Sequence, residues 1–96
     1  MPQRTVAVAS RVGLHARPAM LFTQAVAETG LPVTIARPGG EPVDAGSILF
    51  VMSLGVPSGE EVTLTAEGEG ADAALDALVG LVERDFDEGE AHARIA

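Results

Sequence analysis

With 96 residues, 47% of them hydrophobic, a formal net charge of −8 and no cysteine, the chain suits one domain, 1–96, built around a single core. The missing cysteines exclude disulfides and thiol chemistry. The negative charge and the absence of tryptophan and tyrosine argue against nucleic acid and anionic membranes as partners.

The N-terminal part of the chain predicts a strand followed by a helix. Residues 5–9 form a short run with strand character. After a loop, Ala19, Phe22 and Val26 recur with helical spacing, which predicts a helix over 16–28.

The middle of the chain alternates between strands and a short helix. Residues 32–37 alternate as a half-buried strand does, and residues 41–45 predict a weak return strand whose proline favours a sheet edge. Ser47 is expected to cap a short helix that ends at Gly55. Residues 61–66 are the clearest strand.

The last predicted element is a helix that runs to about residue 85 or 86, and the tail from about 87 lacks a sustained apolar stripe, so we expect it to be mobile. The order is therefore β-α-β-β-α-β-α. Four short strands and three helices predict an α+β open-faced β-sandwich, with a four-stranded antiparallel sheet and three helices on one side. Ferredoxin-like proteins share much of this order, so periodicity alone leaves that alternative open. The apolar stripe of the last helix consists of Ala71, Ala74, Leu75, Leu78 and Val82.

The segment 13–19, Gly-Leu-His-Ala-Arg-Pro-Ala, places His15 at or near the start of the first helix. A helix N-terminus favours an anion such as phosphate, and Arg17 adds a permanent cation. Both should disfavour imidazolium and so leave a ring nitrogen free to attack at neutral pH. Pro18 is tolerated in the first turn. The plainer alternative is an exposed histidine at a helix start, although histidine is not a preferred N-cap.

Segment 13–19 resembles the active-site motif of the HPr family, the histidine-containing phosphocarriers of the phosphoenolpyruvate-dependent sugar phosphotransferase system. Segment 47–55 resembles the family's second, serine-led motif, and the element order follows the family from about residue 6 to 86. The resemblance implies that His15 is phosphorylated, through Nδ1, and that Arg17 stabilises the phosphate together with the backbone of Ala16 and Arg17.

The resemblance also implies partners. Family members meet enzyme I and sugar-specific IIA proteins through the first helix and the short helix, so we expect a phosphocarrier without autonomous catalysis and without a cofactor. The short helix carries more apolar residues than its inner face can bury, since Ile48, Val51 and Leu54 can already point into the core; the alternative is that loops or the sheet cover the rest. The expected docking residues are Ala16, Arg17, Met20, Leu49, Phe50 and Met52.

The sequence is consistent with two roles for Ser47. As an N-cap, its hydroxyl accepts a backbone N–H of the next turn. As the counterpart of the family's regulatory serine, it would be a substrate of a serine kinase, and its phosphate would obstruct docking by charge repulsion and desolvation. Regulated relatives often have lysine immediately before this serine, whereas this chain has Gly46 and no lysine anywhere. A regulatory interaction domain acting through the Ser47 helix is the alternative function.

Charge is uneven along the chain. Four arginines against three acidic residues give residues 1–59 a net charge of +1, and eleven acidic residues against two arginines give residues 60–96 a net charge of −9. We expect the site to lie in the less acidic half; the plainer alternative is that the acidic half only keeps the protein soluble.

The remaining features exclude other chemistry. His15 and His92, with no cysteine and no metal-ligand spacing, predict no metal site, and we assign His92 no role. No run approaches the roughly 18 apolar residues of a membrane span, and no signal peptide is apparent. We expect a soluble, monomeric, cytoplasmic protein without direct membrane insertion.

Overall fold

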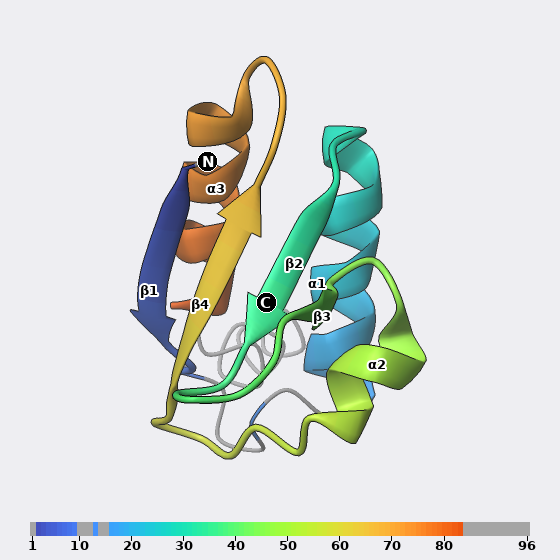
Figure 1. The fold of residues 1–96 in the computed structure, drawn as a ribbon. Coiled ribbons are helices and arrows are strands. Elements are labelled where there is room, and N and C mark those ends of the chain that lie inside the picture. The colour runs from blue at the N-terminus through green and yellow to red at the C-terminus, as the bar shows by residue number, and fades with distance from the viewer. Residues whose placement is uncertain (1, 10–12, 14–15, 84–96) are drawn as a thin grey trace, which may run out of the picture.

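The computed structural model describes residues 2–9, 13 and 16–83, and the mobile tail predicted from about residue 87 lies outside these ranges. Figure 1 shows the elements in the predicted order, β-α-β-β-α-β-α, which is confirmed. In chain order they are β1 (Gln3–Ala7), α1 (Ala16–Thr29), β2 (Val33–Ala36), β3 (Val43–Asp44), α2 (Ile48–Ser53), β4 (Glu61–Ala66) and α3 (Ala71–Val82).

The four strands form one sheet in the order β1-β4-β2-β3, and every neighbouring pair is antiparallel. Strand β4 lies between β1 and β2, with Thr63 opposite Thr5 and Thr65 opposite Thr34. The predicted four-stranded antiparallel sheet is confirmed.

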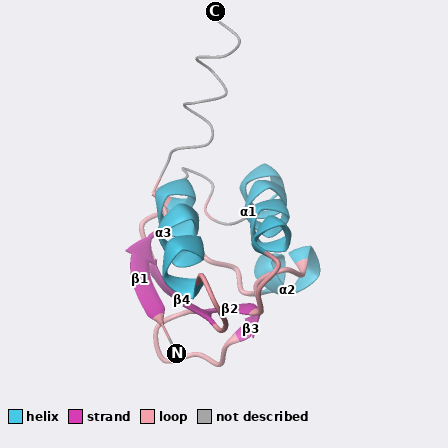
Figure 2. Cartoon of the chain, turned by 90° about the horizontal axis from the view of Figure 1, so that it is seen from above, coloured by secondary structure: helices cyan, strands magenta, loops and turns pink. Residues whose placement is uncertain are grey.

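The helices cover one face of this sheet, as predicted for an open-faced sandwich. Figure 2 shows α1 and α3 over the same face, and α2 packs against α1. On the other face, Thr5 and Thr63 place their hydroxyl oxygens 3.3 Å apart. The strands alternate buried and more exposed residues because successive side chains point to opposite faces. The largest fully buried apolar side chains of the core include Phe22, Ile35, Leu64, Leu75 and Leu78.

Strand boundaries differ from the predicted ones where pairing determines them. Strand β1 begins two residues earlier than predicted, because its pairing with β4 runs from Gln3 opposite Thr65 to Ala7 opposite Glu61. Strand β3 shrinks to Val43–Asp44, consistent with the proline before it, which has no N–H to donate. The last helix ends at Val82, with Glu83 as its C-cap, so its predicted end at residue 85 or 86 is three or four residues too late.

Candidate functional site

Helix α1 begins at Ala16, the residue after His15, so its predicted start is confirmed. His15 itself lies outside the described residues. In the first turn Arg17 is exposed and Pro18 is fully buried. The ring of Pro18 removes an N–H that the first turn leaves without an intrahelical acceptor in any case, so it starts the helix at little cost. The first turn contains no acidic residue, so no carboxylate opposes the positive end of the helix dipole.

Gly13 packs against the segment that follows α2. Its φ is +73°, and it is buried against the backbone of Val56 and Pro57. A methyl group at this position would overlap the Val56 carbonyl oxygen and approach the Pro57 Cα to 3.0 Å. Both the positive φ and the close backbone approach therefore require glycine. Gly13 is the first residue of the motif 13–19, but the sequence does not predict its contact with the backbone of Val56 and Pro57.

Helix α2 is capped at its N-terminus by Ser47, as predicted. Ser47 has extended backbone angles, and its Oγ accepts a hydrogen bond from the Phe50 N–H at 3.4 Å. The Val51 N–H donates to the Ser47 carbonyl at 3.0 Å. The predicted stop is also confirmed, because Gly55 has a φ of +63° and its N–H donates to the Met52 carbonyl.

The Ser47 cap predicts a modest stability loss on removal. We expect Ser47→Ala to lower the free energy of unfolding by about 0.5–1 kcal/mol, the lower part of the usual range for caps, because the 3.4 Å bond is long. Denaturant unfolding followed by circular dichroism measures the change. Ser53→Ala is the matched control, since Ser53 donates its hydroxyl to the Leu49 carbonyl within the same helix and caps nothing. Equal losses in the two variants would contradict a capping role.

Apolar side chains lie exposed around the start of α1 and on α2. The exposed fraction is 39% for Met20, 75% for Leu49 and 53% for Phe50. Met52 is half-buried and packs against the core. Ala16 is the first residue of α1. The docking role predicted for this set stays a prediction, and the exposure of Leu49 and Phe50 is what such a role requires.

Ile48 differs from its expected core position. Its exposed fraction is 38%, whereas Val51 is fully buried and Leu54 is half-buried against the core. Helix α2 has six residues, so less than two turns are available to pack inward. Val51 occupies the inner face, and Ile48 at the first position of the helix adds to the exposed apolar surface.

Arg37 and Glu60 form an ion pair at the other end of α2. The Arg37 Nη2 donates to the Glu60 carboxylate at 2.8 Å, its Nε donates to the second carboxylate oxygen, and its Nη1 donates to the Leu54 carbonyl at 3.0 Å. Hydrogen bonding to Arg37 lowers the pKa of Glu60 from its ordinary value, so the carboxylate stays ionised at neutral pH. The sequence patterns do not predict this pair.

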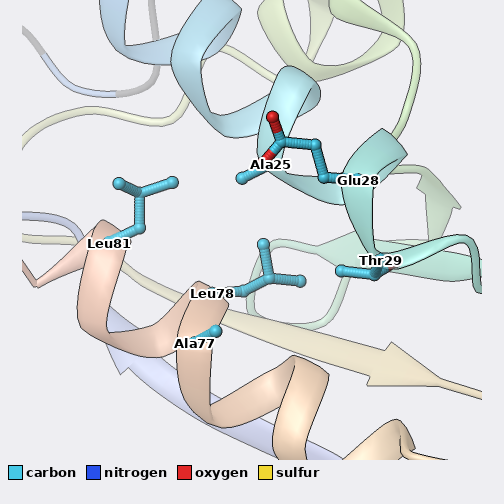
Figure 3. Close-up of a pocket in the computed structure, with 6 residues that line it drawn as sticks. All are labelled: Ala25, Glu28, Thr29, Ala77, Leu78 and Leu81. Carbon is cyan, nitrogen blue, oxygen red and sulfur yellow. The ribbon is translucent and has the colours of Figure 1, made fainter.

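A shallow hollow of about 280 Å³ lies between α1 and α3, and Figure 3 shows Leu78 and Leu81 pointing from α3 toward α1. On the α1 side the hollow is lined by residues of the last turns of that helix, Ala25, Glu28 and Thr29. The hollow therefore lies at the opposite end of α1 from the candidate site.

Within the described ranges, no cluster of three or more acidic or histidine side chains could hold a metal ion. Nor does any helix in these ranges have the length and hydropathy to span a membrane.

The family model "PTS HPr component phosphorylation site" matches residues 2–84. The chain belongs to the HPr family. The phosphocarrier protein HPr of Streptomyces coelicolor is 49% identical over 88 residues, which cover 92% of this chain and 95% of that protein. The resemblance inferred from segments 13–19 and 47–55 is thereby confirmed.

Solved structures agree with the family and the fold. HPr from Bacillus anthracis matches with a TM-score of 0.80 and 40% identity, covering 84% of this chain and 95% of that one. The HPr-like protein Crh of Bacillus subtilis matches with a TM-score of 0.69 and 41% identity, covering 90% of this chain and 98% of that one, and was solved as a swapped dimer. The monomeric state expected for this HPr family member stays a prediction.

Proposed function

We propose that this chain is a cytoplasmic phosphoryl carrier that takes a phosphoryl group from the phosphohistidine of enzyme I and passes it to a histidine on sugar-specific IIA proteins. The phosphoryl group on enzyme I comes ultimately from phosphoenolpyruvate. A ring nitrogen of His15 forms the new phosphorus–nitrogen bond, while the donor's phosphorus–nitrogen bond breaks and its imidazole retains the electron pair. The observation that carries the proposal is the match of residues 2–84 to a family defined by its phosphorylation site, joined to a helix that begins directly after His15.

The start of α1 suits the bound phosphoryl group. A phosphoryl group on histidine carries negative charge on its oxygens, and the first turn of a helix offers N–H donors with a partial positive charge. We assign the backbone N–H groups of Ala16 and Arg17 and the guanidinium of Arg17 to this anion. The absence of an acidic residue in this turn supports the assignment, because a carboxylate there would compete for the same donors.

We assign partner docking to the exposed apolar residues of α2 together with the start of α1. The assigned residues are Ala16, Arg17, Met20, Leu49, Phe50 and Met52. A partner that covers Leu49 and Phe50 buries apolar surface already exposed in this protein, which favours association. Met20 and Met52 have flexible side chains that suit more than one partner surface.

The docking assignment predicts a large effect of one charge on α2. We expect Leu49→Asp to weaken binding to enzyme I by about tenfold or more, because an exposed apolar contact is replaced by a carboxylate that the complex must desolvate. The melting temperature should change little, since Leu49 is 75% exposed. Isothermal titration calorimetry measures the affinity. Ala73→Asp, at an exposed position of α3, adds the same charge as a control and should leave the affinity within about twofold.

Incubation with phosphoenolpyruvate and enzyme I tests the function directly. We expect one equivalent of acid-labile phosphate on the intact chain, located on His15 by NMR of the imidazole. A product that resists acid would show a phosphorylated hydroxyl, and an unmodified chain would show that the relay does not run through this protein. Either result would overturn the proposal.

A second candidate function is a regulatory interaction domain that acts through the Ser47 helix. The exposed Leu49 and Phe50 favour it, as does similarity to Crh, which is described as a catabolite repression protein of Bacillus subtilis. In this alternative α2 binds a regulator whether or not His15 carries phosphate. A serine kinase acting on Ser47 would control the same surface. Two negative charges at the N-cap would repel an acidic partner and would have to be desolvated against an apolar one.

A further inference from the structure

Arg37 joins three segments that are distant in the sequence. It follows β2 directly, and its guanidinium binds both carboxylate oxygens of Glu60, the residue before β4. The third contact, 3.0 Å from Nη1 to the Leu54 carbonyl, lies at the C-cap of α2. The last turn of α2 contains no basic residue, so Arg37 supplies from the sheet the cation that a helix C-terminus favours.

The residues that follow α2 contact Gly13, two residues before His15. The chain runs from Leu54 to Val56, which is buried, and to Pro57. Gly13 packs against the backbone of Val56 and Pro57, with no room for a side chain. Arg37 therefore holds one end of a short continuous path that passes through residues 54–57 and reaches the residue two positions before His15.

We propose that Arg37 is a positioning residue for phosphoryl transfer, which fixes the end of α2 relative to Gly13, two residues before His15. This inference rests on the proposed function. A partner that accepts or donates a phosphoryl group must contact α2 and His15 at the same time. When α2 is less firmly held, a smaller fraction of the free chains is ready to dock, and this raises KM while leaving the maximal rate nearly unchanged. The Glu60 carboxylate orients the Arg37 guanidinium, and the Leu54 carbonyl accepts a hydrogen bond from it.

A purely stabilising role is a weaker explanation, because the pair is partly exposed. The exposed side-chain fractions are 39% for Arg37 and 24% for Glu60, and ion pairs open to solvent add little to global stability. Arg4 offers a matched comparison. It is 34% exposed and binds Asp72 and Asp76 of α3 at 3.2 and 3.3 Å, but it contacts neither α2 nor residues 54–57 in the bonds described for it.

The test compares Arg37→Gln with Arg4→Gln in the intact chain, as substrates of enzyme I with phosphoenolpyruvate as donor. Both variants lose one positive charge and one set of ion pairs. We expect Arg37→Gln to raise the KM of enzyme I for this chain about fivefold, with a maximal rate within about twofold, and Arg4→Gln to leave both within about twofold. Amide NMR shifts should change at Gly13, Leu54 and Val56 in the first variant alone. Arg37→Lys, which keeps the charge but not the three-way contact, should give an intermediate KM.

The outcomes separate the two proposals. If the wild-type chain takes up no phosphate, the proposed function is wrong and the positioning role is wrong with it. If the wild type is phosphorylated but Arg37→Gln keeps the wild-type KM, or if Arg4→Gln raises KM equally, the positioning role alone is overturned. Should Arg37→Gln fail to fold, Glu60→Gln replaces it, because it weakens the same pair and keeps an acceptor for the guanidinium, and a wild-type KM in that variant overturns the role as well.

Discussion

His15→Ala should abolish phosphate uptake from phosphoenolpyruvate and enzyme I. The other nitrogen side chain in the motif 13–19, Arg17, stays protonated at neutral pH and is therefore a poor nucleophile. We expect the rate to fall by at least about a thousandfold. Acid-labile phosphate per chain, measured with intact-mass spectrometry before and after acid treatment, gives the readout. The variant should remain folded, because His15 precedes α1 and is not a preferred N-cap.

Two controls test whether the loss is specific to His15 and whether docking survives it. His92→Ala removes the second of the two histidines and should retain full phosphorylation, which assigns the phosphate to His15. Binding of the His15→Ala variant to enzyme I should persist, because Leu49 and Phe50 still supply the apolar surface. Residual acid-labile phosphate on His15→Ala, at a level near that of the wild type, would contradict the assignment. Survival of a regulatory interaction in the same variant would support the second candidate function beside the first.

The fold could be predicted from the sequence wherever a segment's own pattern determines its structure. The sequence predicts a strand over residues 61–66, the bounds that β4 has, because strict alternation leaves one way to bury Val62 and Leu64. Strand β1 was predicted two residues late. Its limits depend on pairing with β4, and that pairing is a property of two segments more than fifty residues apart.

In the candidate site, too, the features determined by local sequence could be predicted and those determined by distant residues could not. The start of α1 at Ala16 and the Ser47 cap follow from local chemistry, and both predictions are confirmed. The Arg37 contacts could not be predicted, because Glu60 is 23 residues away in the chain and a backbone carbonyl such as that of Leu54 leaves no mark in the sequence. The spacing of the apolar residues predicts that Ile48 faces the core, and this prediction is wrong. The exposure of Ile48 depends on how a helix of six residues packs.

Gly13→Ala should lower both the stability of the fold and the rate of phosphate uptake. A side chain at φ +73° is strained, and its Cβ would overlap the Val56 carbonyl oxygen and press on Pro57. These backbone atoms cannot rotate away as a side-chain tip can, so either the loop or residues 54–57 must move. We expect the free energy of unfolding to fall by about 2–3 kcal/mol and phosphate uptake by enzyme I to slow by about tenfold or more, because His15 lies two residues further on.

Gly39→Ala separates the two causes of this loss. Gly39 has nearly the same backbone angle, φ +71°, but no atom lies within 4 Å of the position that a Cβ would take. It therefore carries the cost of the left-handed conformation alone, about 1 kcal/mol, and lies in the turn after β2, where it should leave phosphate uptake unchanged. If chemical denaturation gives the two variants the same loss, the contact between Gly13 and residues 56–57 does not constrain the loop. A greater loss for Gly13→Ala, accompanied by slower phosphate uptake, would show that close backbone packing, and not glycine's conformational freedom alone, holds the loop before His15 in place.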